Sequence, residues 1–149
     1  MFFKKKNWPG IKKEILQNFY NNLIINYHNT IINFLSFQNI NLSYNVNELH
    51  KLKNILLSAP NPKSHALKNG LDILCTTDLR EEMIFLKTPS LRIYGSLDTL
   101  VPKKITTILN HNLPNSYSVI IKNAVHIPFL SHKKQFISTI FNFIKKVTT

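Results

Sequence analysis

The sequence predicts an α/β protein in which a helical segment is followed by a short parallel β-sheet. Residues from about 11 to 75 show helical periodicity. Two short apolar runs follow, at 91–94 and 117–121, and an amphipathic stretch comes after each of them. Because strand–helix–strand–helix order favours parallel pairing with helices packed on the sheet, we expect a β-α-β-α layer in the second half of the chain.

The helical part contains four stretches. In the first, apolar side chains recur on one helix face after a Pro9-Gly10 turn: Ile11, Ile15, Leu16, Phe19 and Leu23. Apolar stripes at 27–35 and 49–56 and a segment at about 63–75 predict three more helices, with the Asn-rich stretch 39–47 as a break. Four modest helices in a row are typical of a cap, so we expect residues 1–80 to form a helical lid and residues 81–149 to form the β-α-β-α portion of a core.

The second part begins where the period of the pattern changes. The run 91–94 is bounded by Pro89 and Gly95, as a buried strand is expected to be, and a helix is predicted from Val101-Pro102. The run 117–121 and a closing helix at 133–147 complete the pattern. Two parallel strands alone leave an unpaired apolar edge, so we expect further strands that this sequence does not include.

Two polar side chains follow the predicted strands. Asp98 lies four residues past Tyr94, and His126 lies five past Ile121. Because the carboxyl ends of neighbouring parallel strands meet at one sheet edge, we expect the two side chains to lie close together. Asp followed by His is the order of the acid and base in Ser…Asp…His sites of α/β-hydrolases. The alternative is that each side chain merely caps its own turn.

The nucleophile of such a site is missing from this sequence. A Gly-x-Ser-x-Gly elbow needs glycines four residues apart, and the only three glycines are Gly10, Gly70 and Gly95. Ser58, Ser64 and Ser131 have no such setting, and the lone Cys75 lies at the end of a helical run without an elbow. The remaining histidines show no metal-ligand spacing and are assigned to surfaces: His28, His50, His65, His111 and His132.

Composition narrows the classes of partner. The net charge is +12 at pH 7, and the lysines are spread over the chain, which argues against a nucleic-acid stripe and leaves either a solvated surface or a surface for an acidic protein. One cysteine excludes a disulfide within the chain. Neither a signal peptide nor a stretch of about 18 apolar residues is present, so we expect a cytoplasmic protein without membrane contact. We also expect no metal and no cofactor.

Five segments together carry a family resemblance: Trp8–Lys12, Phe34–Gln38, Gly70–Arg80, Leu91–Pro102 and His126–His132. They resemble the pimeloyl-[acyl-carrier protein] methyl ester esterases of biotin synthesis. The match runs from Trp8 to about Val147 and covers only the C-terminal portion of that family. The fold that the resemblance implies is a partial α/β-hydrolase, namely the helical lid and the last two strand–helix units of the parallel sheet.

The resemblance also implies an activity. The family are carboxylesterases that cleave the methyl ester of pimeloyl carried on acyl carrier protein and release methanol. By resemblance, Asp98 is the triad acid, and His126 is the triad base and contacts the substrate. The lid stretch that lines the acyl channel corresponds to Phe34, Leu35, Ser36, Phe37 and Gln38, with plain lid packing as the alternative for the two phenylalanines.

Acyl carrier protein is the partner that the resemblance implies. Where the family's lid presents arginines to this acidic partner, the chain has uncharged residues or a histidine: Asn29, Asn33, Val46 and His50, with Lys51 and Lys53 nearby.

Three hypotheses follow from the sequence. The leading one is the C-terminal portion of such an esterase, encoded by a truncated or split gene and inactive until a separate N-terminal half supplies the nucleophile. The second is a basic, non-enzymatic interaction module. The third is a decayed gene product.

Overall fold

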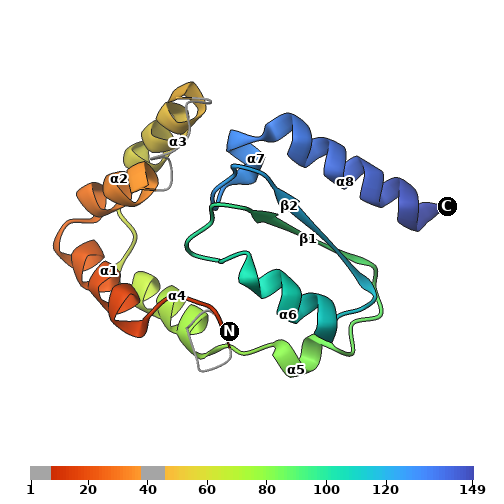
Figure 1. Cartoon of the computed structure of the whole chain (residues 1–149). Helices are drawn as coiled ribbons and strands as arrows, with labels where there is room; N and C mark the ends of the chain where they lie inside the picture. The colour runs from red at the N-terminus through yellow and green to blue at the C-terminus, as the bar shows by residue number, and fades with distance from the viewer. Residues whose placement is uncertain (1–7, 38–45) are drawn as a thin grey trace. The chain divides into compact units, whose positions relative to one another are not determined.

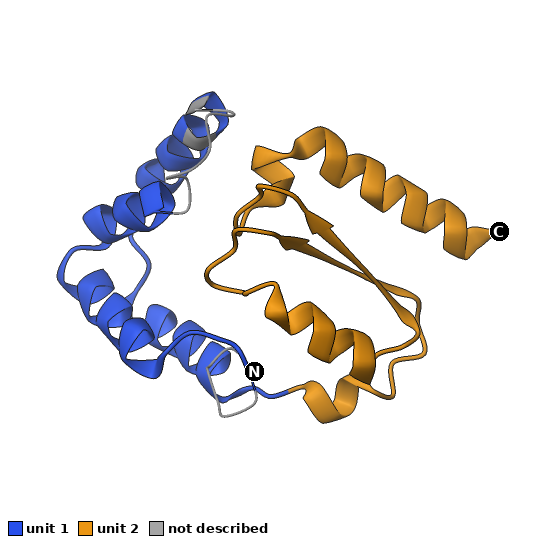
Figure 2. Ribbon diagram, viewed as in Figure 1, with its two compact units in different colours: residues 1–78 blue, residues 79–149 orange. Residues whose placement is uncertain are grey.

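A computed structural model describes residues 8–37 and 46–149, except for the side chains of Val46 and Leu49. The chain divides into two compact units, Met1–Asp78 and Leu79–Thr149, and each is described by itself (Figure 2). This division falls two residues before the boundary expected from the sequence. No helix in the described residues is long and apolar enough to cross a membrane.

Unit 1 is helical throughout its described elements. They are α1 (Lys13–Ile25), α2 (Tyr27–Phe37), α3 (Val46–Ser58) and α4 (Ser64–Thr76) (Figure 1). All four predicted helices are therefore confirmed. The predicted break at 39–47 lies mostly outside the described residues. The third helix ends just before Ala59-Pro60, because a residue that precedes proline is disfavoured in the helical conformation.

The core of unit 1 lies around α1, which packs against α2 and α4. Its buried side chains are Trp8, Ile11, Leu16, Leu23 and Leu35. The rings of Phe19 and Phe34 pack with centroids 5.2 Å apart. Ile15 was predicted to share the buried face but is 57% exposed. The reason is that Leu16 and Leu23 define the buried stripe, and Ile15 lies one residue, about 100°, away from it.

Asn26 separates α1 from α2. Its backbone N–H donates to the Asn22 carbonyl (2.8 Å), which ends α1. Its side-chain Oδ1 accepts the Asn29 N–H (3.1 Å), a capping bond that begins α2. One asparagine thus turns the chain between two nearly continuous helices.

Unit 2 contains the sheet. In chain order its elements are α5 (Arg80–Met83), β1 (Ser90–Gly95), α6 (Lys104–Asn112), β2 (Ser116–Ile121), α7 (Pro128–Ser131) and α8 (Lys133–Thr148). The two strands pair in parallel, with Ser90 opposite Ser116 and Gly95 opposite Ile121. Both predicted strands and their parallel pairing are confirmed. The four-residue helices α5 and α7 were not predicted, because one turn is too short to show a period.

The two long helices of unit 2 lie on opposite faces of the sheet (Figure 1). On the α8 face, the Tyr117 ring meets the Phe143 ring at 5.5 Å, and Lys146 Nζ lies 4.4 Å from the Tyr117 centroid. On the α6 face, the Arg92 guanidinium donates to Asn110 Oδ1 (2.8 Å), to Ser116 Oγ (2.8 and 3.1 Å) and to Tyr94 Oη (3.3 Å). The contacts named on the α8 face are thus aromatic and cation–π contacts, whereas those named on the α6 face are hydrogen bonds of Arg92.

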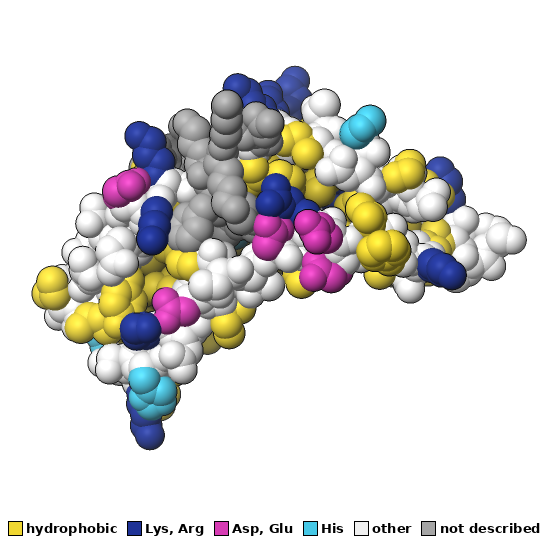
Figure 3. All heavy atoms as spheres, turned by 90° about the horizontal axis from the view of Figure 1, so that it is seen from below, with side chains coloured by type: hydrophobic (Ala, Val, Ile, Leu, Met, Phe, Trp, Pro, Cys, Tyr) yellow, Lys and Arg dark blue, Asp and Glu magenta, His cyan; other side chains and the backbone are white. Residues whose placement is uncertain are grey.

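Unit 2 leaves much apolar surface uncovered, and Figure 3 shows hydrophobic side chains reaching the surface. In β1 only Tyr94 and Gly95 are buried, and the other four residues are partly exposed. Helix α8 has a second apolar stripe, Ile137, Phe141 and Ile144, which points away from its sheet contact and is 41–59% exposed. A parallel sheet is normally covered on both faces and paired on both sides of its inner strands. The uncovered surface agrees with the expectation that further elements complete this layer.

Candidate active site

The loops that follow β1 and β2 bring Asp98 and His126 together. His126 Nδ1 lies 3.0 Å from Asp98 Oδ2, at the carboxyl edge of the sheet. The prediction that these two side chains lie close together is confirmed. Their separation of 28 residues is the length of one helix and one strand, which returns the chain to the same edge.

The two carboxylate oxygens of Asp98 have different hydrogen-bond partners. Oδ2 faces His126, and Oδ1 accepts the backbone N–H groups of Leu100 (2.8 Å) and Val101 (2.9 Å). The side chain is only 6% exposed. An ionised carboxylate accepts hydrogen bonds at both oxygens, so three N–H donors satisfy the negative charge that this loop encloses.

The hydrogen bond to Asp98 fixes the tautomer of His126. A carboxylate only accepts, so the proton of the neutral imidazole lies on Nδ1 and the lone pair lies on Nε2. The side chain is 38% exposed. Among the described residues, Nε2 has no hydrogen-bond partner. An imidazole held in this way can take a proton at Nε2 while the carboxylate stabilises the cation that forms.

The predicted alternative, in which Asp98 caps its own turn, is also present in the structure. Because Leu100 and Val101 are held in the turn by Oδ1, helix α6 begins at Lys104 and not at the predicted Val101-Pro102. The cap and the histidine contact use different oxygens, so the two interpretations are compatible.

Three hydrogen bonds tie the Asp98 loop to the His126 loop. The N–H of Ser96 donates to the Ile121 carbonyl (3.0 Å), and the N–H of Leu97 donates to the Ala124 carbonyl (2.8 Å). In return, the N–H of Asn123 donates to Ser96 Oγ (2.8 Å). The distance between Asp98 and His126 is thus set by bonded backbone rather than by two independent loops.

Backbone geometry explains why glycine and asparagine occupy two further positions in these loops. A Cβ atom on Gly95 would lie 2.2 Å from the Val125 carbonyl oxygen and 2.5 Å from that of Ala124. Asn123 adopts φ 61°, a left-handed conformation that asparagine tolerates better than most side chains. Sequence reasoning missed Ser96 and Asn123 as parts of the site. An asparagine two residues past the predicted strand was the one signal for such a turn.

The described residues offer no elbow-type nucleophile at this site. Ser131 Oγ lies 2.9 Å from its neighbour His132 and donates to the Ile127 carbonyl. Burial raises the pKa of the Cys75 thiol, and Asp72 adds to this effect, so the reactive thiolate is disfavoured. Among the described residues, no group of three or more His, Cys, Asp or Glu side chains could hold a metal ion.

The predicted acyl-channel residues belong to unit 1. Phe34 and Phe37 line an open groove of about 540 Å³ between α1 and α2, which also contains Phe19 and the amides of Asn22, Asn26, Asn29 and Asn33. Leu35 is 6% exposed and belongs to the core, and Ser36 is exposed. Gln38 lies outside the described residues.

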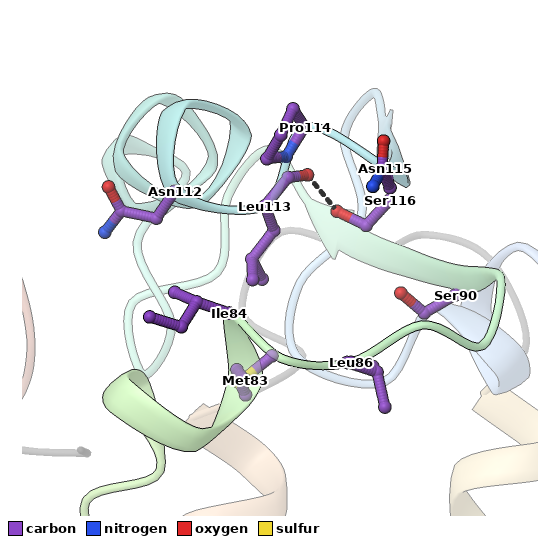
Figure 4. A pocket seen from close by; sticks show the side chains of 9 residues that line it. All are labelled: Met83, Ile84, Leu86, Ser90, Asn112, Leu113, Pro114, Asn115 and Ser116. Carbon is purple, nitrogen blue, oxygen red and sulfur yellow. Dashed lines mark hydrogen bonds between the residues drawn. The ribbon is translucent and has the colours of Figure 1, made fainter.

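A second hollow lies at the opposite edge of the sheet from His126. It measures about 80 Å³ and is lined by Met83, Ile84 and Leu86 on one side and by Asn112–Ser116 with Ser90 on the other (Figure 4). Ser116 Oγ donates to the Leu113 carbonyl there (2.7 Å). Its distance along both strands from the carboxyl edge excludes this hollow from the candidate active site.

Comparison with known proteins identifies similar sequences. The chain is 45% identical over 147 residues to the pimeloyl-[acyl-carrier protein] methyl ester esterase of Wigglesworthia glossinidia brevipalpis. It is 40% identical over 139 residues to the enzyme of the same name from Proteus mirabilis. These matches cover 97% and 93% of the chain but only 57% and 53% of the relatives, so the chain spans about half their length. No family model matches the sequence.

Solved structures show the same fold. An esterase from Exiguobacterium antarcticum superposes with a TM-score of 0.82 over 97% of this chain and 53% of its own, at 18% identity. A bromoperoxidase from Bacillus anthracis gives a TM-score of 0.71, again over 97% of this chain and 53% of its own, at 22% identity. Both are α/β-hydrolases, so the prediction of a partial α/β-hydrolase is confirmed.

Proposed function

The chain is homologous to part of the pimeloyl-[acyl-carrier protein] methyl ester esterases, and from this premise we propose that it supplies the acid–base half of such an enzyme. In this proposal it is the C-terminal portion of a carboxylesterase that hydrolyses the methyl ester of pimeloyl-[acyl-carrier protein] in biotin synthesis, with the cytoplasm as its expected compartment. Residues 1–80 act as the lid, and residues 81–149 as the C-terminal part of the core.

The observation that carries the proposal is the 3.0 Å contact between His126 Nδ1 and Asp98 Oδ2. With its lone pair on Nε2, His126 accepts the proton of a serine hydroxyl as the serine oxygen attacks the ester carbonyl. Collapse of the tetrahedral intermediate breaks the bond to methoxide, which takes the proton from His126 and leaves as methanol. A water molecule, deprotonated by His126 in the same way, then attacks the acyl-serine; the acyl–serine bond breaks, the serine oxygen takes the proton from His126, and the free acid leaves.

The serine comes from outside these 149 residues in this proposal. The sequence holds no Gly-x-Ser-x-Gly. A complementary N-terminal half would add strands beside the open sheet and a helix against the apolar stripe Ile137, Phe141 and Ile144. Burial of this stripe removes apolar surface from water, which favours assembly of the two halves.

The substrate side of the proposal involves the groove between α1 and α2. Phe34 and Phe37 offer apolar contact to an acyl chain, and the surrounding asparagine amides offer hydrogen bonds. Leu35 and Ser36 contribute less directly in this arrangement, because one packs in the core and the other faces solvent.

Reconstitution tests the proposal. The 149-residue chain is co-expressed with the N-terminal half of the Wigglesworthia relative, and release of methanol from a pimeloyl methyl ester on acyl carrier protein is measured. We expect turnover that falls by about 10⁴-fold in kcat in Asp98→Asn, in which the histidine tautomer is wrong, and by a similar or larger factor in His126→Ala.

The matched control for this experiment is His132→Ala. His132 lies in the same unit and bonds to Ser131, and no ion pair joins it to a carboxylate among the residues that the structure describes. It should retain nearly full activity. Unchanged activity in His126→Ala or Asp98→Asn would exclude the proposed acid–base pair. A complex that forms normally but never turns over would favour the non-enzymatic interaction module.

A further inference from the structure

The carboxyl edge of unit 2 carries a cluster of five lysines, called the lysine edge below: Lys103, Lys104, Lys122, Lys133 and Lys134. Lys122 directly follows β2, and the two pairs stand where α6 and α8 begin. In a parallel strand–helix unit these positions all lie at the edge where the strands end, which is the edge of Asp98 and His126. All five lysines are exposed.

Four of these lysines stand where helix electrostatics disfavours a cation. The amino end of a helix is its positive end, and acidic side chains are the favoured residues in the first turn. Neither α6 nor α8 has an acid there, and no side chain caps either helix. The lysines therefore add to the positive potential of the two helix ends, at some cost in stability. Lysines in the first turn of a helix, where acidic residues are favoured, are expected where the surface has a function.

The negative charges of unit 2 do not offset this potential. Between Ser96 and Lys134 the only acidic residue is Asp98, which is buried and occupied by its three N–H donors. Glu81 and Glu82 lie on α5, which borders the hollow at the amino ends of the strands (Figure 4). Within unit 2, uncompensated positive charge is thus concentrated at the carboxyl edge.

We propose that the lysine edge is the docking surface for an acidic carrier protein, which it holds beside His126. The identity of this partner as acyl carrier protein rests on the proposed function. An acidic partner would offset both the lysine charges and the helix ends, and it would deliver its tethered ester to the edge where the imidazole stands. Complementary charge of this kind raises association rates and weakens steeply with salt.

The test measures binding of acyl carrier protein to the full 149-residue chain, alone and in the reconstituted complex. One variant replaces the five lysines of the lysine edge with glutamine. A matched control replaces five lysines elsewhere: Lys12, Lys13, Lys63, Lys87 and Lys145. The two variants lose the same net charge. Because exposed ion pairs contribute modestly but add up, we expect affinity at low salt to fall at least about ten-fold in the edge variant and less than about three-fold in the control.

Equal losses in the two variants would overturn the proposal, because they would show a response to net charge alone. Tighter binding of a short DNA duplex, or of anionic lipid vesicles, than of acyl carrier protein would overturn it as well. Far-ultraviolet dichroism confirms that both variants are folded like the parent chain.

The variant His126→Ala distinguishes the proposed docking surface from the proposed esterase activity. It should bind acyl carrier protein like the parent chain while it abolishes hydrolysis in the complex. Edge-specific binding without any His126-dependent hydrolysis would support the docking surface and refute the esterase. Hydrolysis that depends on His126 but is unchanged in the lysine-edge variant would support the esterase and refute the docking surface.

Discussion

Gly95 is the residue at which the geometry of the site depends on the absence of a side chain. The carbonyls of Ala124 and Val125 occupy the space that a Cβ would need. They belong to the loop that carries His126, so any atom added at Gly95 moves the imidazole relative to Asp98.

We predict that Gly95→Ala disrupts both the fold and the chemistry. A 2.2 Å contact with backbone cannot be relieved by a side-chain rotation, so we expect a loss of about 1–3 kcal/mol in the free energy of unfolding of the reconstituted complex. Chemical denaturation of the complex measures this loss. Gly70→Ala is the control, since nothing lies within 4 Å of that Cβ and α4 should gain up to about 1 kcal/mol. Equal stability of the two variants would contradict the close approach.

A second prediction concerns Ser96, whose hydroxyl accepts the Asn123 N–H. Ser96→Ala removes this bond, so the His126 loop should loosen by about 0.5–1.5 kcal/mol. The readout is the low-field proton signal of the His126 ring in the complex, which should broaden or shift as exchange with water increases. Ser138→Ala, which removes a hydroxyl on α8 that donates to the Gln135 carbonyl, should leave the signal unchanged. A sharp, unshifted signal in Ser96→Ala would show that the cross-loop bond does not hold the ring.

The sequence was sufficient to predict that Asp98 and His126 lie close together, but not the bonds that hold their loops in place. Their pairing follows from strand order alone, because parallel strands end at a common edge. The roles of Ser96 and Asn123 depend on which carbonyl lies opposite which N–H, and no periodicity encodes that. The burial of Ile15 was predicted wrongly for a related reason, since a spacing pattern gives an approximate helix face and not the exact stripe that a neighbour covers.

At the scale of elements, α8 is the most informative helix. One side contacts the sheet through Phe143, and the other carries Ile137, Phe141 and Ile144, which are 41–59% exposed. The sequence predicted α8 as an amphipathic helix with one face. The second stripe becomes visible only once the position of the sheet is known.

Phe141 and Phe143 provide a matched pair of substitutions. Phe141→Asp should leave unit 2 folded and raise the soluble fraction of the chain, because its ring is 59% exposed, yet it should prevent assembly with the N-terminal half. Phe143→Asp should unfold unit 2, because a carboxylate would lie against the Tyr117 ring. Soluble yield and size-exclusion chromatography of the mixed halves measure the two effects. Normal assembly of Phe141→Asp would exclude α8 from the interface.

The whole molecule consists of two units, and the sheet of the second has two strands within the described residues. Large apolar side chains are exposed on that sheet and on the helices around it, among them Ile120, Phe129 and Phe141, and exposed apolar surface of this kind favours association over an isolated, well-packed domain.

We therefore predict that the chain alone melts without a sharp transition and hydrolyses no activated ester above a buffer blank. Near-ultraviolet dichroism and release of a chromogenic alcohol check the two parts. A cooperative melt of a monomer would indicate a self-contained domain. Turnover that survives replacement of Ser58, Ser64 and Ser131 but is lost in His126→Ala would reveal an unrecognised nucleophile.

The contacts of Arg92 with Ser116, Tyr94 and Asn110 determine how unit 2 responds to added salt in a binding measurement. All of these acceptors are uncharged, so the bonds that join β1, β2 and α6 are not ion pairs between opposite charges. Added salt weakens interactions between exposed charges but has little effect on hydrogen bonds to neutral hydroxyl and amide groups. Ionic strength can therefore be raised until an acidic partner dissociates from the lysines while this face of the sheet keeps its contacts.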